Sequence, residues 1–103
     1  MIFEVLARER CAYFASRYGV SFSKITIRAQ KTRWGSCSKD GNLSFNYRIA
    51  ALEPRLADYV IVHEICHIIA FDHSKAFWDL VSREIPEHAD IKKRMRNLAF
   101  IYS

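Results

Sequence analysis

Two histidines and a glutamate interrupt an apolar stretch near the middle of this chain. His63, Glu64 and His67 stand in the run HEICH, and His73 follows shortly after it. Imidazole nitrogens are common zinc ligands, and a carboxylate beside a bound ion can act as a general base. With this composition a random HExxH would occur in roughly one such chain per hundred, and a further nearby histidine is much rarer. The spacing therefore predicts a metal site.

A helix would separate these residues from the core. At about 100° per residue, His63, Glu64 and His67 fall on one side of the helical wheel. Cys66 falls well away from His67, so we interpret it as core packing rather than as a ligand. The residues on the roughly opposite side are all apolar: Ile61, Val62, Ile65, Ile68 and Ile69.

His73 can join the other two histidines only if the helix ends before it. In a continued helix His73 would lie about 280° from His63, on the wrong side. We expect Phe71 and Asp72 to turn the chain back, because aspartate tolerates a left-handed conformation. Three histidines would leave the fourth position of Zn²⁺ open for water, which is typical of a catalytic site. Zinc is the default ion, with nickel and cobalt as possible substitutes.

Composition favours one compact domain over residues 1–103. Half of the residues are hydrophobic, which is enough for a core and argues against disorder. The three cysteines are widely spaced and form no CxxC pair, so they suit a reducing cytoplasm rather than a disulfide framework or a zinc ribbon. No apolar run approaches the roughly 18 residues of a membrane span, and no signal peptide is evident.

Apolar spacings of three and four predict a helix over residues 1–18. Gly19 is expected to end it in a left-handed conformation. The helical pattern begins at Met1 without a capping sequence, so we expect either a trimmed piece of a longer protein or an unusually short member of its family. The predicted buried stripe consists of Phe3, Leu6, Ala7, Cys11, Phe14 and Tyr18.

Alternation of apolar and polar residues predicts strands over 24–30 and 43–48, with an irregular strand at 33–38. The first would bury Ile25, Ile27 and Ala29. The run KDGN before the last strand predicts a hairpin turn with Gly41 at positive φ. We expect these strands to form a small antiparallel sheet.

Three helices complete the predicted α+β fold. The site helix runs from about Pro54 to Ala70, since proline suits a first turn. Ser74 could cap a second helix that stops before Pro86, and the last spans about 87–100.

Three blocks of sequence resemble the YgjP-like metal-dependent hydrolases. They are RWGSCS at 33–38, LSFNYR at 43–48, and DYVIVHEICH at 58–67 followed by HSKAFW at 73–78. This family consists of small zincin-type metallopeptidases, distantly similar to SprT-like proteases. The resemblance implies a minimal zincin-like fold, a zinc site made by His63, His67 and His73, and Glu64 as general base in peptide hydrolysis. Larger relatives carry an additional N-terminal segment.

Other residues are weaker candidates. An oxyanion could be stabilised by Asn46, Tyr47, Arg48 or His88, although a solvated or packed role is the simpler interpretation of each. A carbonyl or one of Asp58, Asp72 and Asp79 should orient the histidines. The segment at 33–36 could form a tight loop against the site helix. Large aromatics usually pack in a small core, so this is the expected role of Trp34, Phe77 and Trp78.

Two other functions stay open. The net charge of +5, a basic strand face at Arg28, Lys31 and Arg33, and the run IKKRMRN fit a nucleic-acid-associated protease or binding module. The alternative is a non-catalytic, zinc-stabilised interaction domain. A peptide or protein substrate is the expected partner, and the sequence does not indicate an oligomeric state.

Overall fold

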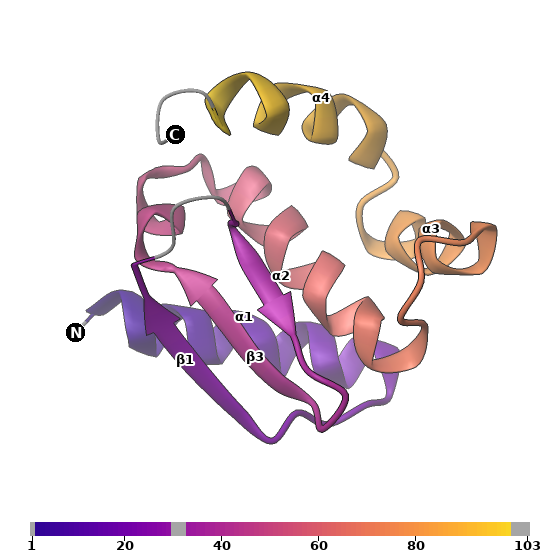
Figure 1. The fold of residues 1–103 in the computed structure, drawn as a ribbon, viewed down its shortest axis with the longest axis horizontal. Coiled ribbons are helices and arrows are strands. Elements are labelled where there is room, and N and C mark those ends of the chain that lie inside the picture. Colours follow the sequence, from indigo (N-terminus) through magenta and orange to yellow (C-terminus); the bar gives the residue numbers. More distant parts are fainter. Residues whose placement is uncertain (1, 30–32, 100–103) are drawn as a thin grey trace.

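The computed structural model describes residues 2–29 and 33–99, with side chains for 4–29 and 33–98. Figure 1 shows α2 at the centre, with the sheet and α1 to one side and α3 and α4 to the other. This arrangement confirms the predicted α+β class. The described elements are α1 (Ile2–Tyr18), β1 (Lys24–Arg28), β2 (Gly35–Cys37), β3 (Asn42–Asn46), the 3-10 helix η1 (Tyr47–Ala51), α2 (Pro54–Ile69), α3 (Lys75–Glu84) and α4 (His88–Ala99).

The sheet is mixed, so the expectation of a wholly antiparallel sheet is wrong. Its strand order is β1-β3-β2. β2 and β3 form an antiparallel hairpin with Gly35 opposite Phe45, and Gly41 in its turn has a φ of 80°, as predicted. β1 pairs with β3 in parallel, with Ile25 opposite Leu43. β1 and β2 lie on opposite edges of β3 and run in opposite directions.

β1 follows the predicted alternation only in part. Ile25 is buried and Ile27 is half-buried, whereas Ala29 lies beyond the end of the strand and is exposed. Gln30 and Lys31, which belong to the predicted strand and its basic face, lie outside the described residues. The parallel pairing with β3 ends at Arg28, and so does the regular strand.

β3 also ends earlier than predicted. The Asn46 side chain accepts a hydrogen bond from the backbone N–H of Arg48 at 3.0 Å and caps η1. Tyr47 and Arg48 therefore belong to a 3-10 helix rather than to a strand. Asparagine competes with regular backbone pairing in this way because its side chain can bond to nearby backbone groups.

The buried stripe of α1 is narrower than predicted. Leu6 is 51% exposed, because it lies about 100° around the helix from its buried neighbour Ala7. The side chain of Phe3 is outside the described residues. Gly19 follows the helix with a φ of 68°, as predicted. The buried residues of the predicted stripe are Ala7, Cys11, Phe14 and Tyr18.

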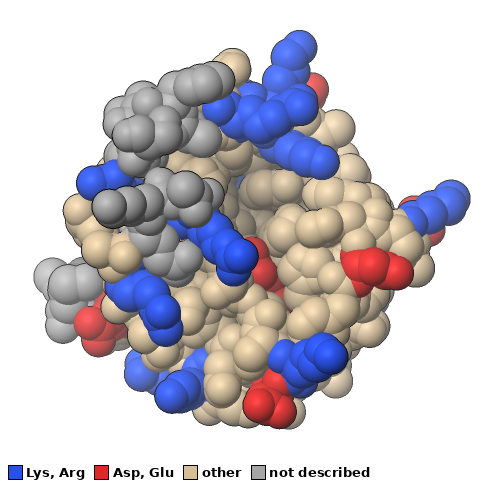
Figure 2. Space-filling view, viewed as in Figure 1, with Lys and Arg blue, Asp and Glu red and all other residues tan. Residues whose placement is uncertain are grey.

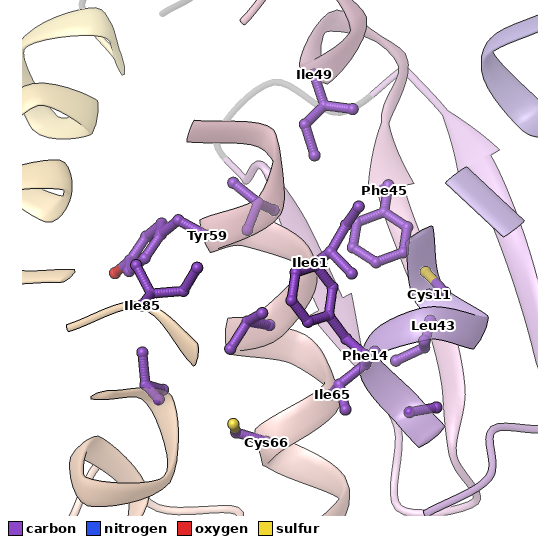
Figure 3. Packing of buried hydrophobic residues seen from close by; sticks show 14 of the residues in the cluster. Cys11, Phe14, Leu43, Phe45, Ile49, Tyr59, Ile61, Ile65, Cys66 and Ile85 are labelled. Atoms are coloured by element: carbon purple, nitrogen blue, oxygen red, sulfur yellow. The ribbon is translucent and has the colours of Figure 1, made fainter. Parts of the chain in front are cut away.

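The main core lies between the sheet, α1 and α2. Figure 3 shows Phe14 of α1, Phe45 of β3 and Ile65 of α2 converging there, and each is at most 2% exposed. Cys66 is fully buried as predicted, and burial raises the pKa of its thiol to about 11, so the thiol stays protonated. Helix α2 is thus fixed by its apolar face.

The last two helices follow the predicted start and stop signals. Ser74 Oγ accepts a hydrogen bond from Phe77 N at 3.4 Å, and α3 ends before Pro86. The predicted end of α4 at Phe100 lies outside the described residues. None of the described helices has the length and apolar character needed to cross a membrane.

Arg55, in the first turn of α2, holds the turn between α3 and α4. Its guanidinium donates to both carboxylate oxygens of Glu87 at 2.6 and 3.0 Å and to the carbonyl oxygen of Glu84 at 2.9 Å. The hydrogen bonds from Arg55 hold the pKa of Glu87 down, to about 2. One side chain therefore joins three helices.

Candidate metal centre

Helix α2 ends before His73, as the site requires, but not through the expected backbone geometry. Ala70 is extended, with φ −137° and ψ 107°, while its N–H still donates to Cys66 O at 2.9 Å. The expected left-handed turn at Asp72 is wrong, since every described non-glycine residue has a negative φ. The chain leaves the helix through extended backbone and returns His73 to the side of His67.

The three histidines form a compact triangle. Ring centroids are 4.8 Å apart for His63 and His67, 5.2 Å for His63 and His73, and 4.8 Å for His67 and His73. One nitrogen from each ring lies within 4.8 Å of the other two. The Nε2 atoms of His67 and His73 are 3.1 Å apart, close to the roughly 3.3 Å between two nitrogens on one tetrahedral zinc. The cluster could therefore hold a metal ion.

The hydrogen bond and the lowered pKa of His67 both suit a metal ligand. Its Nδ1 donates to the carbonyl oxygen of Ala70 at 3.1 Å, which leaves the Nε2 lone pair facing His73. Burial lowers the pKa of His67, and the adjacent His63 ring lowers it further. A neutral imidazole is the form that binds metals.

Two of the three candidate aspartates pair with cationic side chains. Asp58 accepts two hydrogen bonds from Arg10 at 3.0 and 2.9 Å. Asp79 pairs with Lys75 at 3.0 Å on the surface of α3, and Asp72 is exposed. The group that orients His67 is the backbone carbonyl of Ala70, so the predicted alternative to an aspartate applies to this histidine.

Aromatic rings from α3 pack on the cluster. Phe77 is fully buried, as predicted, and stacks on the His67 ring with centroids 4.4 Å apart. Trp78 stacks on His73 at 5.9 Å and on His88 at 5.2 Å. Trp78 is only half-buried, so the prediction that it anchors the core is incomplete. It also supports the exposed His73.

Glu64 lies beneath β2 and is 5% exposed. Its Oε2 lies 3.1 Å from His63 Nδ1. A β-carbon on Gly35 would be 3.1 Å from Glu64 Cγ and 3.2 Å from Phe45 Cδ1, so glycine lets β2 approach α2 closely. The segment does lie against the site helix, but the expected tight loop at 33–36 is wrong, because Gly35 and Ser36 belong to β2. A glycine within a short strand is a known signal of such an approach.

Residues 4–98 match the model of the YgjP-like metallopeptidase domain. The chain belongs to the YgjP-like family. The resemblance seen in the sequence is thereby confirmed, and the domain is of the metallopeptidase type.

Solved structures share the YgjP-like fold of this chain. The crystal structure of the metallopeptidase zymogen abylysin of Pyrococcus abyssi matches with a TM-score of 0.80 and 23% identity, covering 88% of this chain and 92% of that one. The metallopeptidase zymogen jannalysin of Methanocaldococcus jannaschii matches with a TM-score of 0.76 and 21% identity, covering 88% and 94%. No curated protein sequence matches this chain.

A hollow of about 280 Å³ opens beside His63 and Glu64 in this YgjP-like domain. Figure 2 shows it on this face of the molecule, with acidic atoms at its floor and Lys and Arg side chains at its rim. Burial raises the pKa of Tyr59 in its wall to about 12, so the phenol stays protonated. Trp34, expected in the core, is half-buried and also lines the hollow. The other lining residues are Arg33, Gly35, Val60, Lys92, Met95 and Arg96.

The candidate oxyanion stabilisers occupy defined positions in this YgjP-like domain. Asn46 is buried, and its amide donates to Arg33 O at 3.1 Å. Arg48 Nε donates to the hydroxyl of Tyr47 at 3.3 Å. His88 is connected to His73 through the Trp78 ring. Their part in catalysis stays a prediction.

Proposed function

We propose that this chain is a zinc-dependent peptidase in which His63, His67 and His73 bind the ion and Glu64 is the general base. The supporting observation is that three imidazole nitrogens lie within 4.8 Å of one another, beside a buried carboxylate. Three nitrogen ligands with an open fourth position are typical of catalytic zinc. Imidazole ligands also bind other transition metals, so the identity of the metal has to be tested by metal analysis.

A bound zinc ion would supply a Lewis acid and make a water molecule acidic near neutral pH. The Glu64 carboxylate would accept a proton from the attacking water and deliver it to the leaving nitrogen of the amide. Its burial beneath Gly35 restricts its rotation and keeps it beside His63. Glu64 is therefore positioned before substrate binds.

The open edge of β2 supports a peptide as the substrate. Backbone hydrogen bonds of 2.9 and 3.0 Å join Trp34 and Ser38 to β3, so the intervening backbone groups of Gly35 and Cys37 point to the other edge. Figure 1 shows that this edge faces α2. An extended peptide that paired with β2 would pass over Glu64, because Gly35 lies against that side chain.

The proposal covers residues 1–103 as one metallopeptidase domain that acts in a reducing cytoplasm. All three cysteines are free, and Cys11 and Cys66 are fully buried. Free thiols are usual in cytoplasmic proteins.

Metal content and turnover of matched variants test the proposal. Elemental mass spectrometry of the wild type should find about one zinc per chain. His63→Ala should lose the ion, whereas the control His88→Ala should keep it, because His88 is outside the triangle. Glu64→Gln should keep the ion and lose turnover of a cleaved peptide by about 100-fold to 10,000-fold.

Three results would contradict this function. A folded wild type that takes up no added zinc would remove the metal site. Full activity of Glu64→Gln would remove the proposed base. Zinc binding without hydrolysis of a broad peptide library would favour the interaction domain, and tight DNA binding that falls steeply with salt would favour the nucleic-acid-associated alternative.

A further inference from the structure

We propose that the hollow beside Glu64 binds a carboxylate carried by the substrate residue on the C-terminal side of the cleaved bond. This inference rests on the proposed function and names the substrate class for the same site. The carboxylate has two possible sources within a peptide. It is either the side chain of a glutamate or aspartate, or the terminal carboxylate of a chain that ends at that residue.

Three cationic side chains line the hollow, against a single carboxylate among its described lining residues. Arg33, Lys92 and Arg96 all line it and are exposed. Within the described part of the chain, none of the three has an ion-pair partner. Lys92 contacts the Trp78 ring, with Nζ 4.7 Å from the centroid, which directs one charge toward the site. An anion between these side chains would relieve their mutual repulsion.

The floor of the hollow determines what kind of anion fits. Trp34, Val60 and Met95 make the described lining largely apolar, and Glu64 is its acidic residue. A carboxylate at the floor would be repelled by Glu64. The matching group therefore has an apolar stem on the floor and its charge at the rim, as in a glutamate side chain or an apolar C-terminal residue.

The direction of β2 indicates on which side of the cleaved peptide bond the hollow lies. Arg33 and Trp34 precede Gly35 at the start of β2, and they line the hollow. A substrate strand antiparallel to β2, the slightly more stable pairing, would run from Cys37 toward Trp34. Its residues beyond Glu64 would then be those on the C-terminal side of the cleaved bond.

The arrangement fits a peptide carboxylate better than a nucleic acid. Phosphate backbones are bound by cations spaced along a track, and they carry charge at every nucleotide. Here the cations come from two separate elements that line a single hollow, with Arg33 just before β2 and Lys92 and Arg96 in α4. The hollow accommodates one charged group beside an apolar surface.

Matched peptides test the inference by cleavage. One amidated sequence would carry Glu, Gln or Lys after the cleaved bond, and a second would end in leucine at that position, as the free acid or the amide. The Glu peptide, the free-acid peptide or both should be cleaved about tenfold faster than their neutral partners, as expected from a few screened ion pairs. Which pair differs identifies the source of the carboxylate.

A charge reversal on α4 provides the matched comparison. Arg96→Glu should remove the preference for the carboxylate and improve cleavage of the Lys peptide. Lys93→Glu makes the same charge change at an exposed neighbouring position that does not line the hollow, and it should keep the wild-type preference. Equal cleavage of all peptides by the wild type and by Arg96→Glu would overturn the inference and leave the proposed function intact.

A binding measurement separates the two proposals. In zinc-loaded Glu64→Gln protein, fluorescence anisotropy should show tighter binding of the carboxylate peptide than of its neutral partner, with a difference that shrinks at high salt. If that preference is found but the wild type cleaves no peptide, the subsite stands and the proposed function fails. A single-stranded oligonucleotide should not displace the peptide. If it does so, binds more tightly than the peptide and loses affinity in Arg96→Glu, the subsite proposal is overturned in favour of nucleic-acid binding.

Discussion

Gly35 and Glu64 lie in contact between β2 and α2, close enough that a β-carbon on Gly35 would be 3.1 Å from Glu64 Cγ. The same β-carbon would be 3.2 Å from both Phe45 Cδ1 and the Ser44 carbonyl oxygen. The position of the site carboxylate is therefore set by the backbone of a neighbouring strand rather than by a flexible side chain.

We expect Gly35→Ala to damage both stability and activity. The added methyl meets atoms on three sides, so we expect a loss of about 1–3 kcal/mol in the free energy of unfolding. Displacement of Glu64 should lower kcat by at least about tenfold. Denaturant unfolding and steady-state kinetics measure the two effects. Ser36→Ala on the same strand is the control, and wild-type behaviour of Gly35→Ala would contradict the proposed contact.

Phe77→Leu should loosen His67. The Phe77 ring is fully buried and stacks on the imidazole at 4.4 Å. Leucine keeps most of the apolar volume, so we expect a loss of about 1–1.5 kcal/mol in stability and roughly tenfold weaker zinc affinity. Competition with a zinc chelator measures the affinity. Val81→Ala, at another fully buried position of α3, should destabilise the fold without a comparable change in zinc affinity.

Removing the metal should lower stability without unfolding the domain. None of the three candidate ligand histidines belongs to the apolar core cluster of the described residues. A ligand at about 1,000 times its Kd adds about 4 kcal/mol, so zinc should raise the Tm of the wild type and leave that of His63→Ala unchanged. Circular dichroism with and without chelator checks this. Complete unfolding by the chelator would instead favour a structural role for zinc.

The Arg55–Glu87 pair should weaken in acid. Because the pKa of Glu87 is lowered from its usual 4.5 to about 2 in the folded chain, its contribution is present above pH 4.5 and is lost as the pH falls toward 2. Both side chains are about 40% exposed, so the contribution is below about 1 kcal/mol. Glu87→Gln should therefore lower Tm at pH 7 and have little effect near pH 2. Glu9→Gln, at another exposed position, is the control for loss of a carboxylate.

Much of the fold follows from local rules that the sequence displays. Ser74 and Pro54 start helices where predicted, and Gly19 and Gly41 take the positive φ values that their positions predicted. The direction of β1 was not predictable in this way. Alternation specifies the face of each side chain, but it does not specify which strands pair or in which relative direction.

The same distinction between local and long-range features applies to the residues of the candidate site. His63, Glu64 and His67 are close in sequence, so helical spacing alone places them together. The contributions of Lys92 and Arg96 could not be predicted, because they depend on how α4 packs beside α2. The backbone at Ala70 was also missed, since extended conformation at a helix end leaves no residue-type signal comparable to glycine.

Helix α2 carries the core on one face and the candidate metal ligands on the other. Its amide protons should therefore exchange with solvent mainly through global unfolding, since opening α2 alone would expose Ile61, Val62 and Ile65 together. His63, Glu64 and His67 consequently share the lifetime of the native state. The slowest-exchanging segment of the molecule and the proposed catalytic residues should be the same helix, so mutations that speed unfolding will also shorten the time for which the site exists.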